Sequence, residues 1–198
     1  MQTTTTIMKK TARFLLLLVT AAFFTACRST TRTHIYLLTA DDDLQRLPQT
    51  DITFELRPIT LPDYLNRREF VKRIGEDEIC VQRSCLWAET SEHSVNSVFT
   101  LNLKALLGDD NVLPYGSAKD DTPILHISVR RLEVQDDVFL ADFQCRLQRH
   151  GKTIRETRLV WKTDVAADVP AIKYYKKAMS EMARQTAAWL TESSATLR

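Results

Sequence analysis

Apolar and polar residues alternate along several stretches of the chain, and this pattern predicts half-buried β-strands. Ile52, Phe54 and Leu56 form one such pattern, and Pro58 ends it because proline cannot donate to a sheet ladder. Three longer stretches are separated only by short polar or glycine-containing turns, so they predict an antiparallel three-strand meander. These stretches span residues 124–134, 138–148 and 153–163.

Two other stretches carry apolar residues every three or four positions, as an amphipathic helix does. The first begins after Thr90 or Ser91, either of which can cap a helix, and it ends at Gly108. The second runs from 169 to 191, directly after the meander. The order of elements therefore predicts a single α/β domain with a mixed, mostly antiparallel sheet, two long helices and a C-terminal meander followed by a helix.

The N-terminal segment has the pattern of a bacterial lipoprotein signal peptide. Three cationic residues precede an apolar run at 14–24, and a small-residue cleavage site ends on Cys27. The run is shorter than the roughly 17 to 25 apolar residues that span a bilayer, so a transmembrane helix is the weaker interpretation. A plain secretory signal that leaves Cys27 as a free thiol is the other alternative. We expect a signal peptide at 1–26, a lipidated tether at 27–33 and a periplasmic domain at 34–198.

The residue after Cys27 bears on the membrane in which the anchor lies. In lipoproteins of bacteria with two membranes, an Asp at this position marks retention in the inner membrane, and here it is Arg28. By resemblance to those lipoproteins, we expect the acylated Cys27 to hold the domain on the periplasmic face of the outer membrane.

Signal removal changes the charge balance. The whole chain has 27 Lys and Arg against 25 Asp and Glu, for a net charge of +2. The signal removes three cations and no acid, which leaves 24 against 25 and a net charge of −1. Because the remaining cations are scattered without interleaved aromatics, we expect no nucleic-acid surface. The remaining 172 residues suffice for one domain that buries about 70% of its unfolded surface.

Three cysteines remain besides Cys27. Cys80 and Cys85 enclose four residues between two short apolar runs, so a hairpin there would bring the two thiols together, and we expect a disulfide in an oxidising periplasm. We expect no metal site, because one C-x4-C pair lacks a second pair or a matching histidine pair. Cys145 has the inward phase of its strand, which predicts a buried, reduced side chain.

The chain offers few groups for catalysis. Its four histidines stand on different predicted elements and outside any known metal or nucleophile motif. Its four glycines form no phosphate-binding loop, and its paired acids fall in predicted turns. We therefore expect a protein without enzymatic activity and without a cofactor.

Two short stretches resemble a known family. Tyr36-Leu37-Leu38 is followed by Ile59-Thr60-Leu61-Pro62-Asp63-Tyr64-Leu65-Asn66-Arg67, and Leu86-Trp87-Ala88-Glu89 then leads into the predicted helix with Asn102-Leu103. In order and spacing these stretches resemble the ABC-type transport auxiliary lipoproteins of the PqiC (YmbA) type. The segment from Leu61 to Arg67 is the most specific part of the resemblance, which extends over essentially the whole mature chain.

The resemblance implies a three-layer α/β domain and a non-catalytic role. It implies an auxiliary component of an ABC-type system that moves lipid between the two membranes, with a periplasmic MCE-domain protein as the partner. Direct contact with phospholipid and a homo-oligomeric ring that matches the MCE partner are compatible with this role. A structural lipoprotein of another outer-membrane assembly machine is the alternative function, because it would share the anchor without needing an MCE protein.

The resemblance and the turn chemistry together point to one partner-binding segment. An aromatic residue and an arginine beside a rigid proline turn suit a protein interface. The predicted partner-binding residues are Leu61, Pro62, Asp63, Tyr64 and Arg67. The competing interpretation is that Leu61 and Tyr64 cover the edge of the sheet and Asp63 caps the turn. Trp87 is expected in the core, because it directly precedes the first long helix.

Overall fold

The structure is a computed structural model, and it describes residues 32–48, 52–119, 121–166 and 168–194. Contacts divide the chain into two units, Met1–Arg32 and Thr33–Arg198, and the fold described below is that of the second unit. The predicted signal peptide and Cys27 lie outside the described residues.

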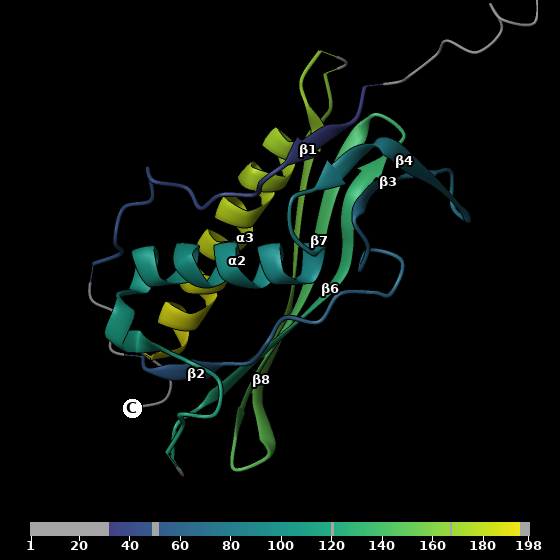
Figure 1. The fold of residues 1–198 in the computed structure, drawn as a ribbon. Coiled ribbons are helices and arrows are strands. Elements are labelled where there is room, and N and C mark those ends of the chain that lie inside the picture. The colour runs from purple at the N-terminus through teal and green to yellow at the C-terminus, as the bar shows by residue number, and fades with distance from the viewer. Residues whose placement is uncertain (1–31, 49–51, 120, 167, 195–198) are drawn as a thin grey trace, which may run out of the picture. The chain divides into compact units, whose positions relative to one another are not determined.

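One mixed sheet of eight strands forms the centre of the domain (Figure 1). Two long helices, α2 (Ser91–Leu107) and α3 (Ala171–Ser194), pack on it, and a 3-10 turn, η1 (Asp109–Asn111), follows α2. The strands are β1 (His34–Tyr36), β2 (Phe54–Leu56), β3 (Glu69–Ile74), β4 (Glu78–Trp87), β5 (Val112–Leu113), β6 (Ile124–Gln135), β7 (Val138–Arg149) and β8 (Lys152–Asp164).

Strand β6 organises the sheet because it has neighbours along both edges. On one edge it pairs antiparallel with β7 over nearly its whole length, and β7 pairs in the same way with β8. On the other edge it pairs parallel with β2 near its start and with β3 near its end. Strand β4 pairs antiparallel with β3, β1 pairs parallel with β4, and β5 pairs parallel with β2.

Both helices lie on the same face of this sheet. The ring of Phe99 in α2 has its centroid 5.8 Å from that of Phe143 in β7. Cys145, two residues further along β7, lies 3.9 Å from the Thr186 hydroxyl of α3. Because residues two apart on a strand share a face, the two helices cover one side together. Each fully buried Phe or Leu in this layer stabilises the fold by about 1.5–3 kcal/mol.

An aromatic cluster joins the β3–β4 hairpin to α3. Phe70 of β3 packs on Trp87 at a centroid distance of 4.3 Å, and Tyr175 of α3 meets the Trp87 ring edge-on at 4.9 Å. Trp87 is buried, which confirms its predicted place in the core.

The ends of α2 are those that the sequence predicts. The Thr90 hydroxyl accepts a hydrogen bond from the His93 N–H at 3.4 Å, and Gly108 ends the helix at φ 97°, where a side chain would be strained. The predicted fold class, with its mixed sheet, two long helices and C-terminal meander followed by a helix, is confirmed. Because both described long helices cover one face of the sheet, sheet and helices make two layers rather than the three that the resemblance implies. Residues 112–113 form the short strand β5, which pairs with β2.

The predicted disulfide between Cys80 and Cys85 is wrong. Both residues belong to the single ten-residue strand β4, and both are free thiols. Five residues of strand span about 16 Å, whereas a disulfide needs Cα atoms within about 7 Å. The hairpin turn lies instead at Gly75, between β3 and β4. The four residues between Cys80 and Cys85, which were predicted to connect two strands, therefore lie within β4.

Cys145 is buried and reduced, as predicted. Burial raises the pKa of its thiol to about 12, and the hydrogen bond with Thr186 offsets this only in part. At pH 8 the folded protein therefore keeps this thiol protonated and shielded, and its reactivity should be very low.

Alkylation followed by peptide mass spectrometry tests this arrangement of thiols. With iodoacetamide at pH 8 and no reductant, Cys80 should be modified in the folded protein and Cys145 only after unfolding in guanidinium. An unmodified Cys80 that becomes reactive only after reduction would instead show that it forms a disulfide.

Candidate partner-binding site

The predicted partner-binding segment projects from the edge of β6. The chain runs parallel to β6 at β2, again at a bridge between Thr60 and Ser128, and once more at β3. Between the bridge and β3, residues 61–68 leave this edge and form a turn (Figure 1). The turn starts at Pro62, whose carbonyl accepts a hydrogen bond from the Leu65 N–H at 2.9 Å.

Side chains of α2 hold both ends of this turn. The Asn96 carboxamide accepts from the Ile59 N–H at 2.6 Å and donates to the Ile59 carbonyl at 3.2 Å. Ser91 donates from its hydroxyl to the Leu65 carbonyl at 2.6 Å. Buried backbone groups that lack sheet partners are satisfied in this way, so the turn is fixed at both ends to the helix.

The five predicted residues share this turn but divide into two groups. Leu61, Pro62 and Tyr64 are partly buried, and Leu61 and Tyr64 pack against the core. Asp63 is exposed, and the side chain of Arg67 is 38% exposed, with its Nε 3.3 Å from the Glu69 carboxylate. The partial burial of Leu61 and Tyr64 agrees with their covering the sheet edge, whereas Asp63 and Arg67 are the residues available to a partner.

A buried ion pair lies beneath Tyr64. Arg73 of β3 donates from Nε to the Glu133 carboxylate of β6 at 2.6 Å, and its guanidinium lies 5.3 Å from the centre of the Tyr64 ring. The Glu133 side chain is fully buried. The sequence pattern did not indicate this pair, because Glu133 alternates with Leu132 and Val134 as a solvent-facing strand residue would.

The ion pair perturbs the groups around it. Burial, and then the charge of Glu133, raises the pKa of Tyr64 to about 12, so the phenol stays protonated at neutral pH. The hydrogen bond to Glu133 raises the pKa of Arg73. The Tyr64 hydroxyl and the second carboxylate oxygen of Glu133 are both buried, and neither has a hydrogen-bond partner among the described residues. A small rotation that joins them would satisfy both groups.

This arrangement provides surface and rigidity rather than reactive chemistry. Among the described residues, no group of three or more His, Cys, Asp or Glu side chains is placed to hold a metal ion. None of the described helices is both long enough and apolar enough to cross a membrane. His150 pairs with Asp121 on the surface, and His126 lies on the sheet face opposite the helices.

Comparison with known sequences assigns the class of protein. The sequence matches the family of ABC-type transport auxiliary lipoprotein components over residues 36–190, and the chain belongs to this family. It is therefore a lipoprotein that serves as an auxiliary component of an ABC-type transport system. Among curated proteins, none matches the chain.

Solved structures share the fold. A protein of family DUF330 from Xanthomonas campestris is 12% identical, with a TM-score of 0.69 over 83% of this chain and 98% of its own. A second, uncharacterised protein is 15% identical, with a TM-score of 0.65 over 80% of this chain and 99% of its own. At these identities the similarity is one of fold.

Replacing Arg73 with Ala should destabilise the domain strongly, because Glu133 would remain buried without its counter-ion. We expect a loss of about 3–5 kcal/mol in the free energy of unfolding, measured by urea titration. Arg67→Ala, which removes an exposed pair, is the matched control and should cost less than about 1 kcal/mol. Equal losses in the two variants would show that removing Arg73 does not leave an uncompensated buried charge.

Proposed function

We propose that this protein is a non-catalytic auxiliary component of an MCE-type system that moves lipid between the two membranes. In this proposal, an acylated Cys27 anchors it to the periplasmic face of the outer membrane, and the turn at 61–68 docks an MCE-domain protein. The observation that carries the proposal is the turn itself. It is held at both ends by α2 and presents Asp63 and Arg67 to solvent.

The anchor limits where the domain can act. The tether at 27–33 precedes β1, and seven residues of fully extended chain reach at most about 25 Å. A lipoprotein carries more than one acyl chain, and each buried methylene contributes about 0.8 kcal/mol, so the attachment would be stable. The domain would therefore remain within one domain diameter of the membrane, where it could receive the end of a lipid-conducting partner.

The turn is suited to docking because its conformation is set before a partner arrives. Asn96 and Ser91 fix its backbone, and Tyr64 packs over the Arg73 guanidinium. Ordering a flexible loop at an interface costs free energy, and a preformed turn avoids that cost. Two exposed side chains of opposite charge then favour one orientation of the partner.

Crosslinking in intact cells tests this function. The full-length protein would be purified after crosslinking, and mass spectrometry would identify the attached proteins and the modification on Cys27. Recovery of an MCE-domain protein together with an acylated Cys27 is the expected result. Recovery of components of another outer-membrane assembly machine alone, or an unacylated Cys27 without an envelope partner, would overturn the proposal.

Reversing the two exposed charges tests the docking surface. Asp63→Lys combined with Arg67→Glu should reduce the crosslinked yield of the MCE partner at least fivefold, because like charges would then oppose the partner's groups. The melting temperature should change little, since Asp63 is exposed and the Arg67 side chain is 38% exposed.

The control reverses one acid and one base elsewhere on the surface. Asp77 and Arg83 are both exposed, in the β3–β4 turn and on β4 respectively. Asp77→Lys with Arg83→Glu should leave the yield unchanged. Loss of the partner in both double variants would indicate a general charge effect and would remove the turn as the docking site.

A further inference from the structure

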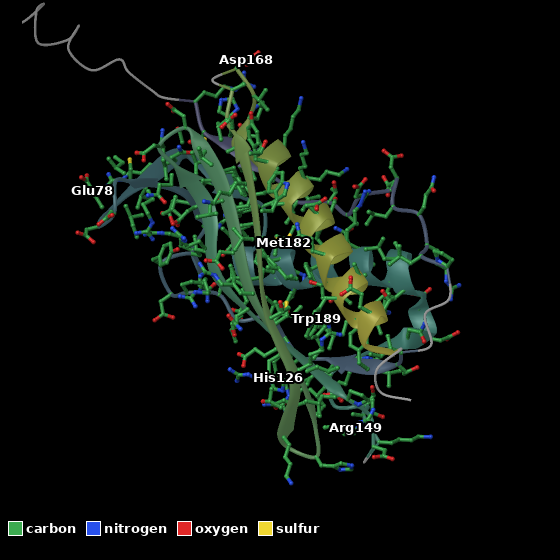
Figure 2. The ribbon with its side chains drawn as sticks, turned by 180° about the vertical axis from the view of Figure 1, so that it is seen from behind. Glu78, His126, Arg149, Asp168, Met182 and Trp189 are labelled. Carbon is green, nitrogen blue, oxygen red and sulfur yellow. The ribbon has the colours of Figure 1, made fainter. Side chains whose placement is uncertain are left out.

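The face of the sheet opposite the helices carries a cluster of arginines. No described helix covers the outer side of β6, β7 and β8, and Figure 2 shows His126 on the other side of β8 from Met182 and Trp189. Arg130 and Arg131 lie at an irregularity of β6, and Arg158 lies on β8. Between them, on β7, is Asp142, which pairs with Val160 in the register of the sheet.

Asp142 is only 1% exposed although it belongs to this open face. Arg158 donates from Nε to one carboxylate oxygen at 2.9 Å and from Nη2 to the other at 2.7 Å. The Nε atom of Arg131 lies 3.8 Å from the carboxylate. The carboxylate thus lies between the two guanidinium groups and holds them in position.

The electrostatics of the cluster show that all three arginines act on Asp142. Burial alone would raise the pKa of the Asp142 carboxyl, but the hydrogen bonds and charge of Arg158 and the charges of Arg130 and Arg131 outweigh it and lower the pKa. Three guanidinium groups around one carboxylate leave two positive charges uncompensated within the cluster. The bidentate contact with Arg158 already satisfies Asp142, so the carboxylate does not by itself explain the other two.

The acidic groups nearby have partners of their own. Glu133 is committed to Arg73, and Glu156 binds Arg146 at 3.0 Å. Further along the same face, the pKa of His126 is lowered first by burial and then by the charges of two other arginines, Arg57 and Arg146. Neither Glu133 nor Glu156 is therefore free to balance the excess charge of the cluster.

We propose that Arg130, Arg131 and Arg158 form a binding site for a phosphate group, held in position by the buried Asp142. Arginine presents planar pairs of N–H donors that match phosphate oxygens, and a side chain already fixed by a carboxylate loses little entropy on binding. The side chains of Arg131 and Arg158 remain 37% and 48% exposed, so a ligand can reach them from solvent. The site does not depend on the proposed partner or on the turn at 61–68.

Phosphate of this kind has two sources, a lipid headgroup or free phosphate. Both would place anionic oxygens between the guanidinium groups, so the shared chemistry defines the site. The two sources can be compared with two water-soluble probes, inorganic phosphate and glycerophosphoglycerol, which is the deacylated headgroup of phosphatidylglycerol.

Thermal unfolding of the full-length protein in a nonionic detergent at pH 7.5 provides the test. Each probe would be titrated against sodium chloride at matched ionic strength. The melting temperature should rise saturably with at least one probe beyond the chloride baseline, because a ligand that binds only the folded state stabilises it. The probe that acts at the lower concentration identifies the source. No rise with either probe would overturn the proposal.

Two double variants make the result specific to the site. Arg130→Gln with Arg131→Gln leaves the Arg158–Asp142 pair intact and should weaken the apparent affinity at least tenfold. Arg83→Gln with Arg184→Gln removes two exposed arginines elsewhere and should respond as the unmodified protein does. Should the first variant fail to fold, phosphorus NMR line broadening of phosphate by the unmodified protein and by Arg130→Gln alone gives the same comparison. An equal response of site and control variants would contradict the assignment.

Discussion

The pairing of β6 along both edges is the constraint on which the rest of the domain depends. Its antiparallel edge carries the meander, and its other edge accepts β2 and β3 in parallel, one after the other. Because both strands use one edge of the same twelve-residue strand, the chain between them must leave that edge and return. The turn at 61–68 is the result, and α2 supplies the polar groups that its backbone lacks.

Two buried carboxylates on β6 and β7 connect this constraint to function. Glu133 is buried because the turn and Arg73 cover it, and Asp142 is buried because arginines cover it. Buried charges of this kind contribute little net stability, but each one fixes the position of its arginine. In the proposals made above, the first pair orders a surface for a protein partner, and the second orders a set of guanidinium groups for an anion.

Local patterns predicted the elements that local chemistry determines. Thr90 and Gly108 mark the ends of α2, and the turns of the meander are short enough to fix its antiparallel order. Parallel pairing of β2 and β3 with β6 joins residues 69 and 62 positions apart, and local spacing in the sequence cannot indicate it. The error at Cys80 and Cys85 had the same origin, since Val81 to Ser84 continue a strand whose pairing with β3 depends on the turn at Gly75.

The hydrogen bonds from Asn96 and Ser91 should keep the turn ordered in the free protein, and native-state hydrogen exchange measures this order residue by residue. The Leu65 N–H, bonded to Pro62, and the Trp87 N–H, bonded to Arg68, report on the turn and on its return to the sheet. Both should exchange far more slowly than in an unstructured peptide, and Tyr64→Ala should accelerate Leu65 while the amides of β7 keep their protection. If the Leu65 amide of the unmodified protein exchanged at the rate of an unstructured peptide, the turn would not be ordered before a partner binds.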